Sequence, residues 1–140
     1  MKNIFLDTNI LLDYLTQRQP FFADAESIFI KAEMGVISLF CSSLSFSTIF
    51  YVLRKFQTKP QLFQTLNDLT QTTTITGVDE TVIKDSLASG FKDLEDAIQY
   101  FSALHFGRID AIVTRNPKDF PNPQIPVFSP AEFLFALNKI

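Results

Sequence analysis

The hydrophobic positions of this 140-residue chain follow two patterns that alternate along its length. Short, continuous runs of apolar or β-branched residues predict strands buried on both faces of a parallel sheet. Apolar residues spaced three and four apart predict the helices between those runs. The expected strands span residues 4–6, 36–41, 72–78, 110–114 and 127–128, and the expected helices span residues 10–15, 20–35, 42–55, 61–70, 82–88, 92–106 and 130–140.

Proline and capping residues set several of these boundaries. Pro20 lies in the first turn of the second helix, where its missing N–H costs nothing. The Lys59-Pro60 pair is interpreted as a break before the fourth helix. Ser129 followed by Pro130 is typical of a capped helix start, and this last helix is expected to run to the C-terminus.

The alternation of strands and helices predicts an α/β fold with a mostly parallel sheet and helices on both of its faces. The chain shows no internal repeat and no linker long enough to separate two domains. We therefore expect residues 1–140 to form a single domain, for which this length is ordinary.

Composition favours a folded domain and limits the classes of partner. Apolar residues make up 46% of the chain, enough for a core, and charged residues make up only 19%, too few for a disordered segment. A net charge of −3 argues against a nucleic-acid binder that works by bulk charge. It leaves room for a local basic rim around an acidic cleft.

The same counts bear on the cellular compartment. Cys41 is the only cysteine, so no intramolecular disulfide can form, and a reducing cytoplasm fits. No apolar run approaches the ~20 residues that span a bilayer, and no signal segment precedes the first strand. We expect a soluble, cytoplasmic protein that does not enter a membrane.

The first predicted strand ends at a carboxylate, Asp7, followed by Thr8 and Asn9. Burying part of an acid at the end of a central strand is costly unless a cation or a hydrogen-bond donor meets it. Ligands of open α/β sheets bind at this end of the strands. The alternative is that Asp7 only caps the next helix.

Further polar residues follow the other strands and should gather at the same edge. Asp93 and Asp96 are three residues apart at the start of the long helix and therefore share one helical face. Glu95 is turned away from Asp96 by ~100°. Asn116 and Asp119 follow the fourth strand. Several carboxylates in one cleft suit a hard cation such as Mg²⁺ or Mn²⁺.

Each of these residues also has a purely structural interpretation. Acids in the first turn of a helix interact favourably with its macrodipole, and this alone would explain Asp93, Glu95 and Asp96. Asn116 before a proline is an ordinary turn residue. His105, the only histidine, falls near the end of an apolar helix, where we expect a structural role.

The motifs taken together resemble the PIN domain family. The resemblance rests on Phe5-Leu6-Asp7-Thr8-Asn9, on Leu94-Glu95-Asp96-Ala97, and on Ile112-Val113-Thr114-Arg115-Asn116 with Asp119-Phe120 behind it, and it covers essentially the whole chain. It implies a three-layer α/β/α domain whose central parallel sheet has five strands in the order 3-2-1-4-5. It also implies a metal-dependent endoribonuclease, as in the toxins of VapBC-type toxin–antitoxin pairs.

The resemblance also implies a set of site residues. The family pattern has acids at about four places, of which the first falls on Asp7 and the third on Asp96. Thr48 stands where the second, a glutamate, is expected, and Asn116 stands at the fourth. By this resemblance Asp7 and Asp96 are the metal ligands. Asp93, Asn116 and Asp119 are then expected to be direct or water-bridged ligands. Thr8, Asn9, Ser45 and Thr48 are expected to orient ligands or water. The basic side chains of Lys92, Arg115 and Lys118 lie beside the acids and are expected to hold the RNA backbone.

Three functions stay open at this point. The first is a Mg²⁺- or Mn²⁺-dependent ribonuclease acting on RNA, a toxin or a relative of one. The second is a PIN domain that has lost catalysis and binds RNA or protein, which the reduced set of acids favours. The third is a small phosphatase or nucleotide-binding domain, against which the lack of a Gly-rich phosphate loop counts. The three cations have the alternative role of solvated surface charges.

Aromatic residues predict protein partners. The chain has 16 phenylalanines, and some of their rings should lie outside the core. We expect exposed apolar surface at Phe21 and Phe22, and on the third helix at Phe46, Phe50 and Tyr51, because a contiguous patch of this kind usually marks an interface. The resemblance implies an antitoxin partner bound near the first helices, and a homodimer.

Overall fold

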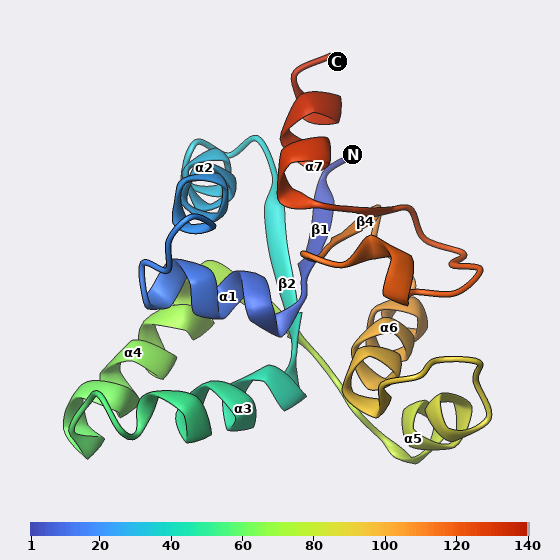
Figure 1. Ribbon diagram of the computed structural model, residues 1–140, viewed down its shortest axis with the longest axis horizontal. Helices are drawn as coiled ribbons and strands as arrows, with labels where there is room; N and C mark the ends of the chain where they lie inside the picture. Colours follow the sequence, from blue (N-terminus) through green and yellow to red (C-terminus); the bar gives the residue numbers. More distant parts are fainter. Residues whose placement is uncertain (140) are drawn as a thin grey trace.

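A computed structural model describes residues 1–139 and has a five-stranded, all-parallel sheet at its centre (Figure 1). The strand order is β3-β2-β1-β4-β5, which confirms the predicted fold class and the predicted order. The strands are β1 (Asn3–Leu6), β2 (Ser38–Ser42), β3 (Thr73–Thr76), β4 (Ala111–Val113) and β5 (Val127–Phe128).

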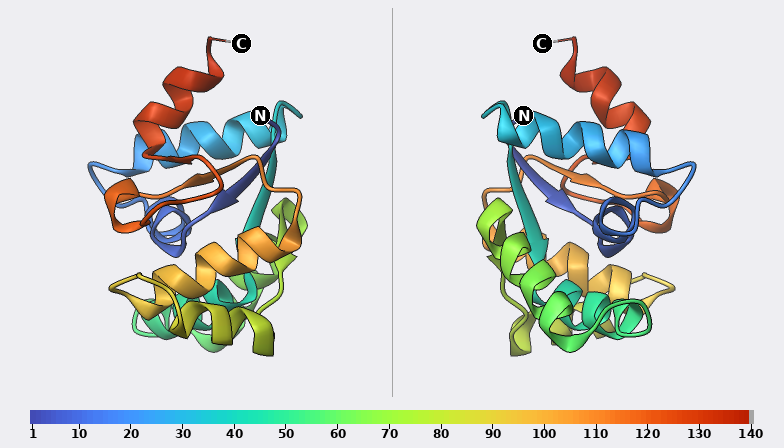
Figure 2. Two further views of the ribbon diagram at one scale, coloured as in Figure 1. Left: turned by 90° about the vertical axis from the view of Figure 1, so that its right-hand side faces the viewer. Right: turned by 90° about the vertical axis from the view of Figure 1, so that its left-hand side faces the viewer.

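Helices cover both faces of this sheet. Helices α1 and α2 lie on one side and α6 on the other, and the two side views show the same layering (Figures 1 and 2). The helices are α1 (Thr8–Leu15), α2 (Phe22–Glu33), α3 (Ser43–Leu53), α4 (Lys59–Thr72), α5 (Glu80–Leu87), α6 (Leu94–Phe106) and α7 (Pro130–Leu137), with a 3₁₀ turn, η1 (Pro117–Asp119).

The continuous apolar runs of the strands supply two cores. Alternate residues of a strand point to opposite faces, so in β1 Ile4 and Leu6 pack with α1, α2, α3, α4 and α7, while Phe5 packs toward α6. Phe40 of β2 joins Phe5 on the α6 side. Both faces of the central strands are buried, which is why the sequence predicts them as runs rather than as an alternating pattern.

Several predicted boundaries are corrected by caps. Lys59-Pro60 is not a break: Thr58 caps α4 by accepting from the Gln61 backbone N–H, and Pro60 lies in the first turn. This helix extends through Thr72, whose hydroxyl donates to the Leu69 carbonyl, so β3 covers only four of the seven residues expected to be strand.

Other ends also shift. Helix α2 begins at Phe22, so Pro20 precedes the helix instead of lying in its first turn as predicted. Helix α6 begins at Leu94 rather than at residue 92, because Asp93 has an extended backbone and caps the helix. Strand β2 begins at Ser38 rather than at residue 36, and α7 ends at Leu137 rather than at the C-terminus. The predicted final residue of α7, residue 140, lies outside the described residues. Within residues 1–139, no helix is long and apolar enough to cross a membrane.

Strand β1 occupies the middle of the sheet and thereby sets the position of the site. Phe5 is in register with Phe40 of β2 and with Ile112 of β4. The backbone N–H of Asp7 continues the ladder by donating to the Val113 carbonyl at 3.0 Å. The residue after β1 therefore lies beside the residue after β4, at the carboxyl edge of the sheet.

Candidate functional site

Asp7 is the central carboxylate of this edge. It is 4% exposed, and its Oδ2 accepts a 2.7 Å hydrogen bond from the hydroxyl of Thr114, the residue after β4. Burial raises the pKa of Asp7, while the hydrogen bond from Thr114 and the nearby dipoles of the Gln99 amide and of the Thr8 and Asn9 N–H groups oppose the rise. Ionising Asp7 in the buried site therefore costs free energy, and the neighbouring hydrogen-bond donors offset only part of that cost.

Thr8 connects the end of β1 to α3 and α6. Its backbone N–H and its hydroxyl both donate to Oε1 of Gln99, at 2.9 and 3.0 Å. The Ser45 hydroxyl lies 2.6 Å from the Thr8 hydroxyl, and it must be the donor because the Thr8 proton is already given to Gln99. All three side chains are buried, so this network fixes the turn that carries Asp7.

Asp96 lies in an acidic cleft of about 340 Å³ at the start of α6. Asp93, as the N-cap, accepts from the Asp96 backbone N–H at 3.0 Å, so its carboxylate closes the first turn. Asp119 comes from η1, and the structure therefore brings together the three acids predicted to share the site. The lining residues are Gly90, Lys92, Asp93, Asp96, Lys118, Asp119 and Pro121.

The electrostatics of Asp96 reflect this crowding. Burial raises the pKa of Asp96 to about 7, and the charges of Asp7, Asp93, Asp119 and Glu95 add to the rise. Each of these groups would repel a second negative charge in the same cleft. In the metal-free protein Asp96 thus keeps its proton to a higher pH than an ordinary aspartate, and a cation bound beside it would favour the ionised form.

This raised pKa predicts how the metal-free protein responds to pH. In the unfolded chain Asp96 has its ordinary pKa of 3.8, so between pH 3.8 and about 7 the folded state binds more protons. The free energy of unfolding should therefore fall as pH rises through that window. Because Asp96 is partly exposed, we discount the effect to about 1–2 kcal/mol, or a few degrees of melting temperature.

The measurement is the melting temperature of the chain in chelator at pH 5 and pH 8, for the native sequence and for Asp96→Asn. Several other groups also titrate, so only the difference between the two proteins isolates Asp96. The variant should melt higher than the native chain at pH 8, with the gap closing at pH 5. An equal gap at both pH values would contradict the prediction.

Glu95 makes a contact beyond the macrodipole role considered for it, because its side chain reaches α3. Its Oε2 accepts a hydrogen bond of 3.2 Å from the Thr48 hydroxyl on α3. Burial raises the pKa of Glu95, the bond from Thr48 lowers it, and the charges of Asp7 and Asp93 raise it further. Glu95 thus contacts α3 in addition to its place in the first turn of α6, because its long side chain reaches sideways to the neighbouring helix.

The three predicted RNA-binding cations differ in their surroundings. Lys92 and Lys118 are exposed and line the acidic cleft. Arg115 is instead held inside the protein: its Nε lies 3.0 Å from Oδ2 of Asp13 on α1, and its guanidinium carbon lies 4.2 Å from the centre of the Phe21 ring. Its main contacts are thus to the protein itself.

The remaining predicted residues lie around this edge with fewer contacts. Asn116 is exposed, and its backbone N–H donates to the Thr114 hydroxyl at 3.3 Å, so that hydroxyl links Asn116 to Asp7. Asn9 is part of α1, and its Oδ1 is buried without a hydrogen-bond partner among residues 1–139. His105 lies away from the site and contacts Asp85 at 2.7 Å, in keeping with its predicted structural role.

The donor atoms at this edge fit a hard divalent cation. They are carboxylate, amide and hydroxyl oxygens, which Mg²⁺ and Mn²⁺ prefer, and the unpaired Oδ1 of Asn9 is a further acceptor. Within residues 1–139, however, no three His, Cys, Asp or Glu side chains are arranged closely enough to form a complete cage. The ligands available are therefore a few carboxylates completed by neutral oxygens or water.

Two residues and one contact in this region were not predicted from the sequence. Gln99 is a buried amide on the apolar side of α6, three residues after Asp96, and that spacing was a usable signal. Asp13 is a 1% exposed acid inside an otherwise apolar helix, which also invites an explanation. The contact of Glu95 with Thr48 had no local signal, because it joins two helices 47 residues apart in the chain.

Comparisons with known proteins agree with the fold. The sequence profile described as the PIN domain matches residues 3–118. The curated protein "Ribonuclease VapC1" from Aquifex aeolicus (strain VF5) is 28% identical over 150 aligned positions, which cover 99% of this chain and 98% of that protein.

Solved structures share the fold at lower identity. One is described as a toxin-antitoxin complex from Klebsiella pneumoniae, with a TM-score of 0.67 and 24% identity over 91% of this chain and 97% of its own. Another is VapBC-1 from nontypeable Haemophilus influenzae, with a TM-score of 0.66 and 16% identity over 92% and 98%. At these identities the likeness establishes the fold alone.

Proposed function

Because the chain belongs to the PIN domain family, we propose that it is a metal-dependent endoribonuclease and the toxin of a toxin–antitoxin pair. The observation that carries the proposal is the buried carboxylate of Asp7 beside the acidic cleft of Asp96. The curated relative, named a ribonuclease, supports the same reaction class. Within residues 1–139, no histidine base or cysteine nucleophile is placed in this region, so hydrolysis would use water.

The proposed cofactor is Mg²⁺ or Mn²⁺, held by Asp7 and Asp96. Asp93, Asn116 and Asp119 would act as direct or water-bridged ligands, since all three lie at the same edge. A divalent cation bound there supplies positive charge that makes water a better nucleophile and screens the charge on the phosphoryl oxygens. Thr114, with the buried network of Thr8, keeps the Asp7 carboxylate oriented toward the cleft.

The proposed substrate is RNA, approached through a mixed rim of charge. Lys92 and Lys118 are exposed at the cleft and would contact phosphates on either side of the scissile bond. Arg115, held by Asp13 and Phe21, would shape the loop after β4 more than it contacts the substrate. Two lysines can contact only a few phosphates. This number fits recognition of RNA at one cleft rather than binding along a long stretch of RNA.

The experiment that tests the function is cleavage of a single-stranded and of a structured RNA by the purified chain. We expect slow cleavage with Mg²⁺ or Mn²⁺ that stops with excess chelator and returns when the metal is added again. Activity that survives chelation would contradict the metal-dependent mechanism. RNA binding without cleavage would favour the second candidate, a PIN domain that only binds.

That second candidate has an observation of its own. Two of the places where the family pattern has acids are occupied by neutral residues, Thr48 and Asn116. Without a complete cage in the described residues, metal affinity depends on how many acids remain close enough to help. The candidate would leave Asp7 and Asp96 important for the shape and charge of the cleft, but not for turnover.

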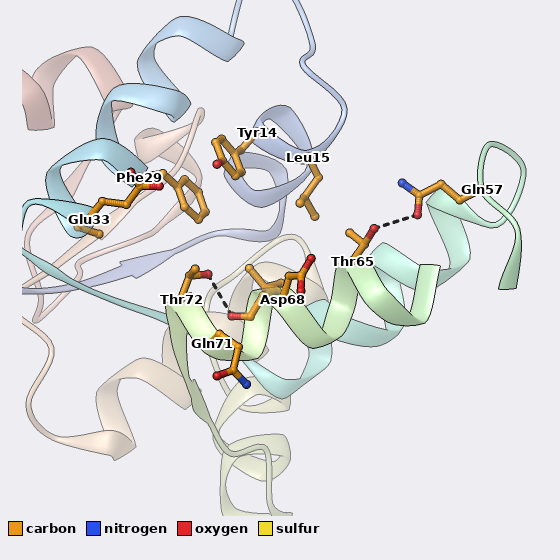
Figure 3. Close-up of a pocket in the computed structure, with 11 residues that line it drawn as sticks. Tyr14, Leu15, Phe29, Glu33, Gln57, Thr65, Asp68, Gln71 and Thr72 are labelled. Carbon is orange, nitrogen blue, oxygen red and sulfur yellow. Dashed lines mark hydrogen bonds between the residues drawn. The ribbon is translucent and has the colours of Figure 1, made fainter. Parts of the chain in front are cut away.

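The proposed protein partner would bind a groove between α1, α2 and α4 (Figure 3). The groove has a volume of about 520 Å³, with Tyr14 stacked on Phe29 at its base and Glu33 and Asp68 among its lining residues. An amphipathic helix with a basic edge would match this combination of apolar floor and acidic lining. The neighbouring structures, which contain toxin–antitoxin complexes, support an antitoxin as this partner.

The groove can be tested with two substitutions on one helix. Ala32→Arg places a long charged side chain in the groove, whereas Ala23→Arg places it on the exposed part of α2 outside it. We expect Ala32→Arg, but not Ala23→Arg, to lose co-purification with the antitoxin that we propose as the partner. Both variants should keep the nuclease activity. Equal retention of the partner by both variants would refute the groove.

Three coarser expectations remain proposals. Phe21, Phe50 and Tyr51 are exposed as predicted, whereas Phe46 packs against the core and Phe22 stacks with Tyr14, so these two rings are only partly exposed. The edge-to-face pair of Phe50 with Phe63 marks the surface through which we propose a homodimer. We also propose that residues 1–140 form a single PIN-like domain. A cytoplasmic location fits the buried, free thiol of Cys41.

A further inference from the structure

The carboxylate of Glu95 points from the first turn of α6 toward α3. It accepts a 3.2 Å hydrogen bond from the Thr48 hydroxyl, although that hydroxyl also lies 3.4 Å from the Leu44 carbonyl, its usual partner within a helix. The Glu95 contact is the shorter of the two. Thr48 therefore positions a carboxylate that belongs to another helix.

This direction needs a cause beyond the helix itself. A glutamate in the first turn interacts with the macrodipole in any rotamer, so the macrodipole does not explain why Glu95 is turned inward. The inward rotamer leaves the carboxylate half-buried against α3 in a region that already holds several acids, and both the loss of water and the like charges are unfavourable. A neutral hydroxyl offsets this only in part, whereas a cation would offset both effects.

A second feature nearby also calls for a ligand. Gln99 is 1% exposed, and its Oε1 is fully used by Thr8. Its Nε2 is buried beside Asp7 and has no hydrogen-bond partner within residues 1–139. An unpaired buried donor is costly, and a phosphate oxygen or a water brought with a cation would pair it.

We propose that Glu95 is a third cation-facing carboxylate of this site and that Thr48 is the positioning residue that holds it. In this arrangement Glu95 of α6 supplies the negative charge that α3 lacks, because α3 has Thr48 where the family pattern has a glutamate. The inference rests on the proposed nuclease function and adds a residue that lies outside the four places of the family pattern. It also explains how a site with few acids at those places would still bind a divalent ion.

The test is a calorimetric titration of the metal-free, full-length chain with Mn²⁺, which does not depend on turnover. Glu95→Gln keeps the shape and the hydrogen bond but removes the charge. The matched control is Glu80→Gln, another first-turn glutamate, which lies on α5 and is paired with Lys84 in solvent. Removing the charge of Glu80 has the same effect on a helix macrodipole as removing that of Glu95. The control therefore separates a macrodipole role from a role in binding the cation.

We expect Glu95→Gln to weaken Mn²⁺ binding about 10-fold or more, and Glu80→Gln to leave it unchanged. Thr48→Val should weaken binding about 3-fold, because it releases the carboxylate without removing it. The double variant Thr48→Glu/Glu95→Gln restores a carboxylate from α3 and should recover most of the affinity. That recovery would not occur if the contact merely fastened α3 to α6.

Two further outcomes separate this inference from the function on which it rests. If Asp7→Asn loses Mn²⁺ binding while Glu95→Gln binds like the native chain, the role of Glu95 is refuted and the nuclease proposal stands. If the native chain neither binds Mn²⁺ nor cleaves RNA, the proposed function fails, and the inference fails with it. Equal Mn²⁺ affinity in Glu95→Gln and in the double variant, both below the native chain, would also overturn it.

Discussion

Replacing Asp7 with asparagine is expected to lower metal-dependent RNA cleavage by about 100-fold or more while leaving the fold intact. The side chain keeps its shape, and its amide oxygen still accepts from the Thr114 hydroxyl. What it loses is the negative charge at the centre of the carboxyl edge. Because burial raises the pKa of Asp7, the charged form is unfavourable in the metal-free fold, so the variant should melt at or above the native temperature.

The control for this prediction is Asp110→Asn, at the opposite edge of the same sheet. Its carboxylate accepts from the backbone N–H groups of Lys2 and Asn3, and these bonds lower the pKa of Asp110. The control should therefore lose a little stability and no activity, the reverse of what we expect at Asp7. Cleavage by Asp7→Asn at the native rate would indicate a contaminating nuclease or a different mechanism.

Much of the architecture was predictable because local and global signals agree. From Ile4 to Leu6 the first strand is continuously apolar, and both of its faces are buried there. The Ser129 cap and the Pro130 that follows it start α7 as expected. The errors fall at boundaries, as at Lys59-Pro60, where the proline belongs to a capped first turn instead of a break.

The site was predictable only as far as backbone position determines it. Residues that directly follow a strand or start a helix, such as Asp7 and Asp96, reach the same edge whatever their side chains do. The direction of a long side chain depends on its neighbours in space. That is why neither the contact of Glu95 with Thr48 nor the partner of Asp13, 102 residues further along the chain, had a signal in the sequence.

Replacing Arg115 with methionine is expected to cost about 3 kcal/mol in the free energy of unfolding. Asp13 is 1% exposed, and Arg115 is the nearest cation, with Nε 3.0 Å from Oδ2. Burial raises the pKa of Asp13, and the charges of Arg115 and Arg18 oppose that rise. Without Arg115 the carboxylate stays buried with one weaker neighbour, and removing one partner of a buried pair typically costs about 3–5 kcal/mol. We expect the low end, because the pair is not aligned as a hydrogen bond.

The double variant Asp13→Leu/Arg115→Met tests the cause of that loss. If the cost comes from an unpaired buried charge, removing both charges should recover most of the stability, since apolar residues of similar volume often replace buried pairs without loss. Urea unfolding of the four proteins gives the coupling free energy. The comparison pair is Lys84–Glu80, which is largely exposed with a 3.1 Å contact, and Lys84→Met should cost less than about 0.5 kcal/mol. A double variant as unstable as Arg115→Met would instead assign the loss to the packing of Arg115 on Phe21.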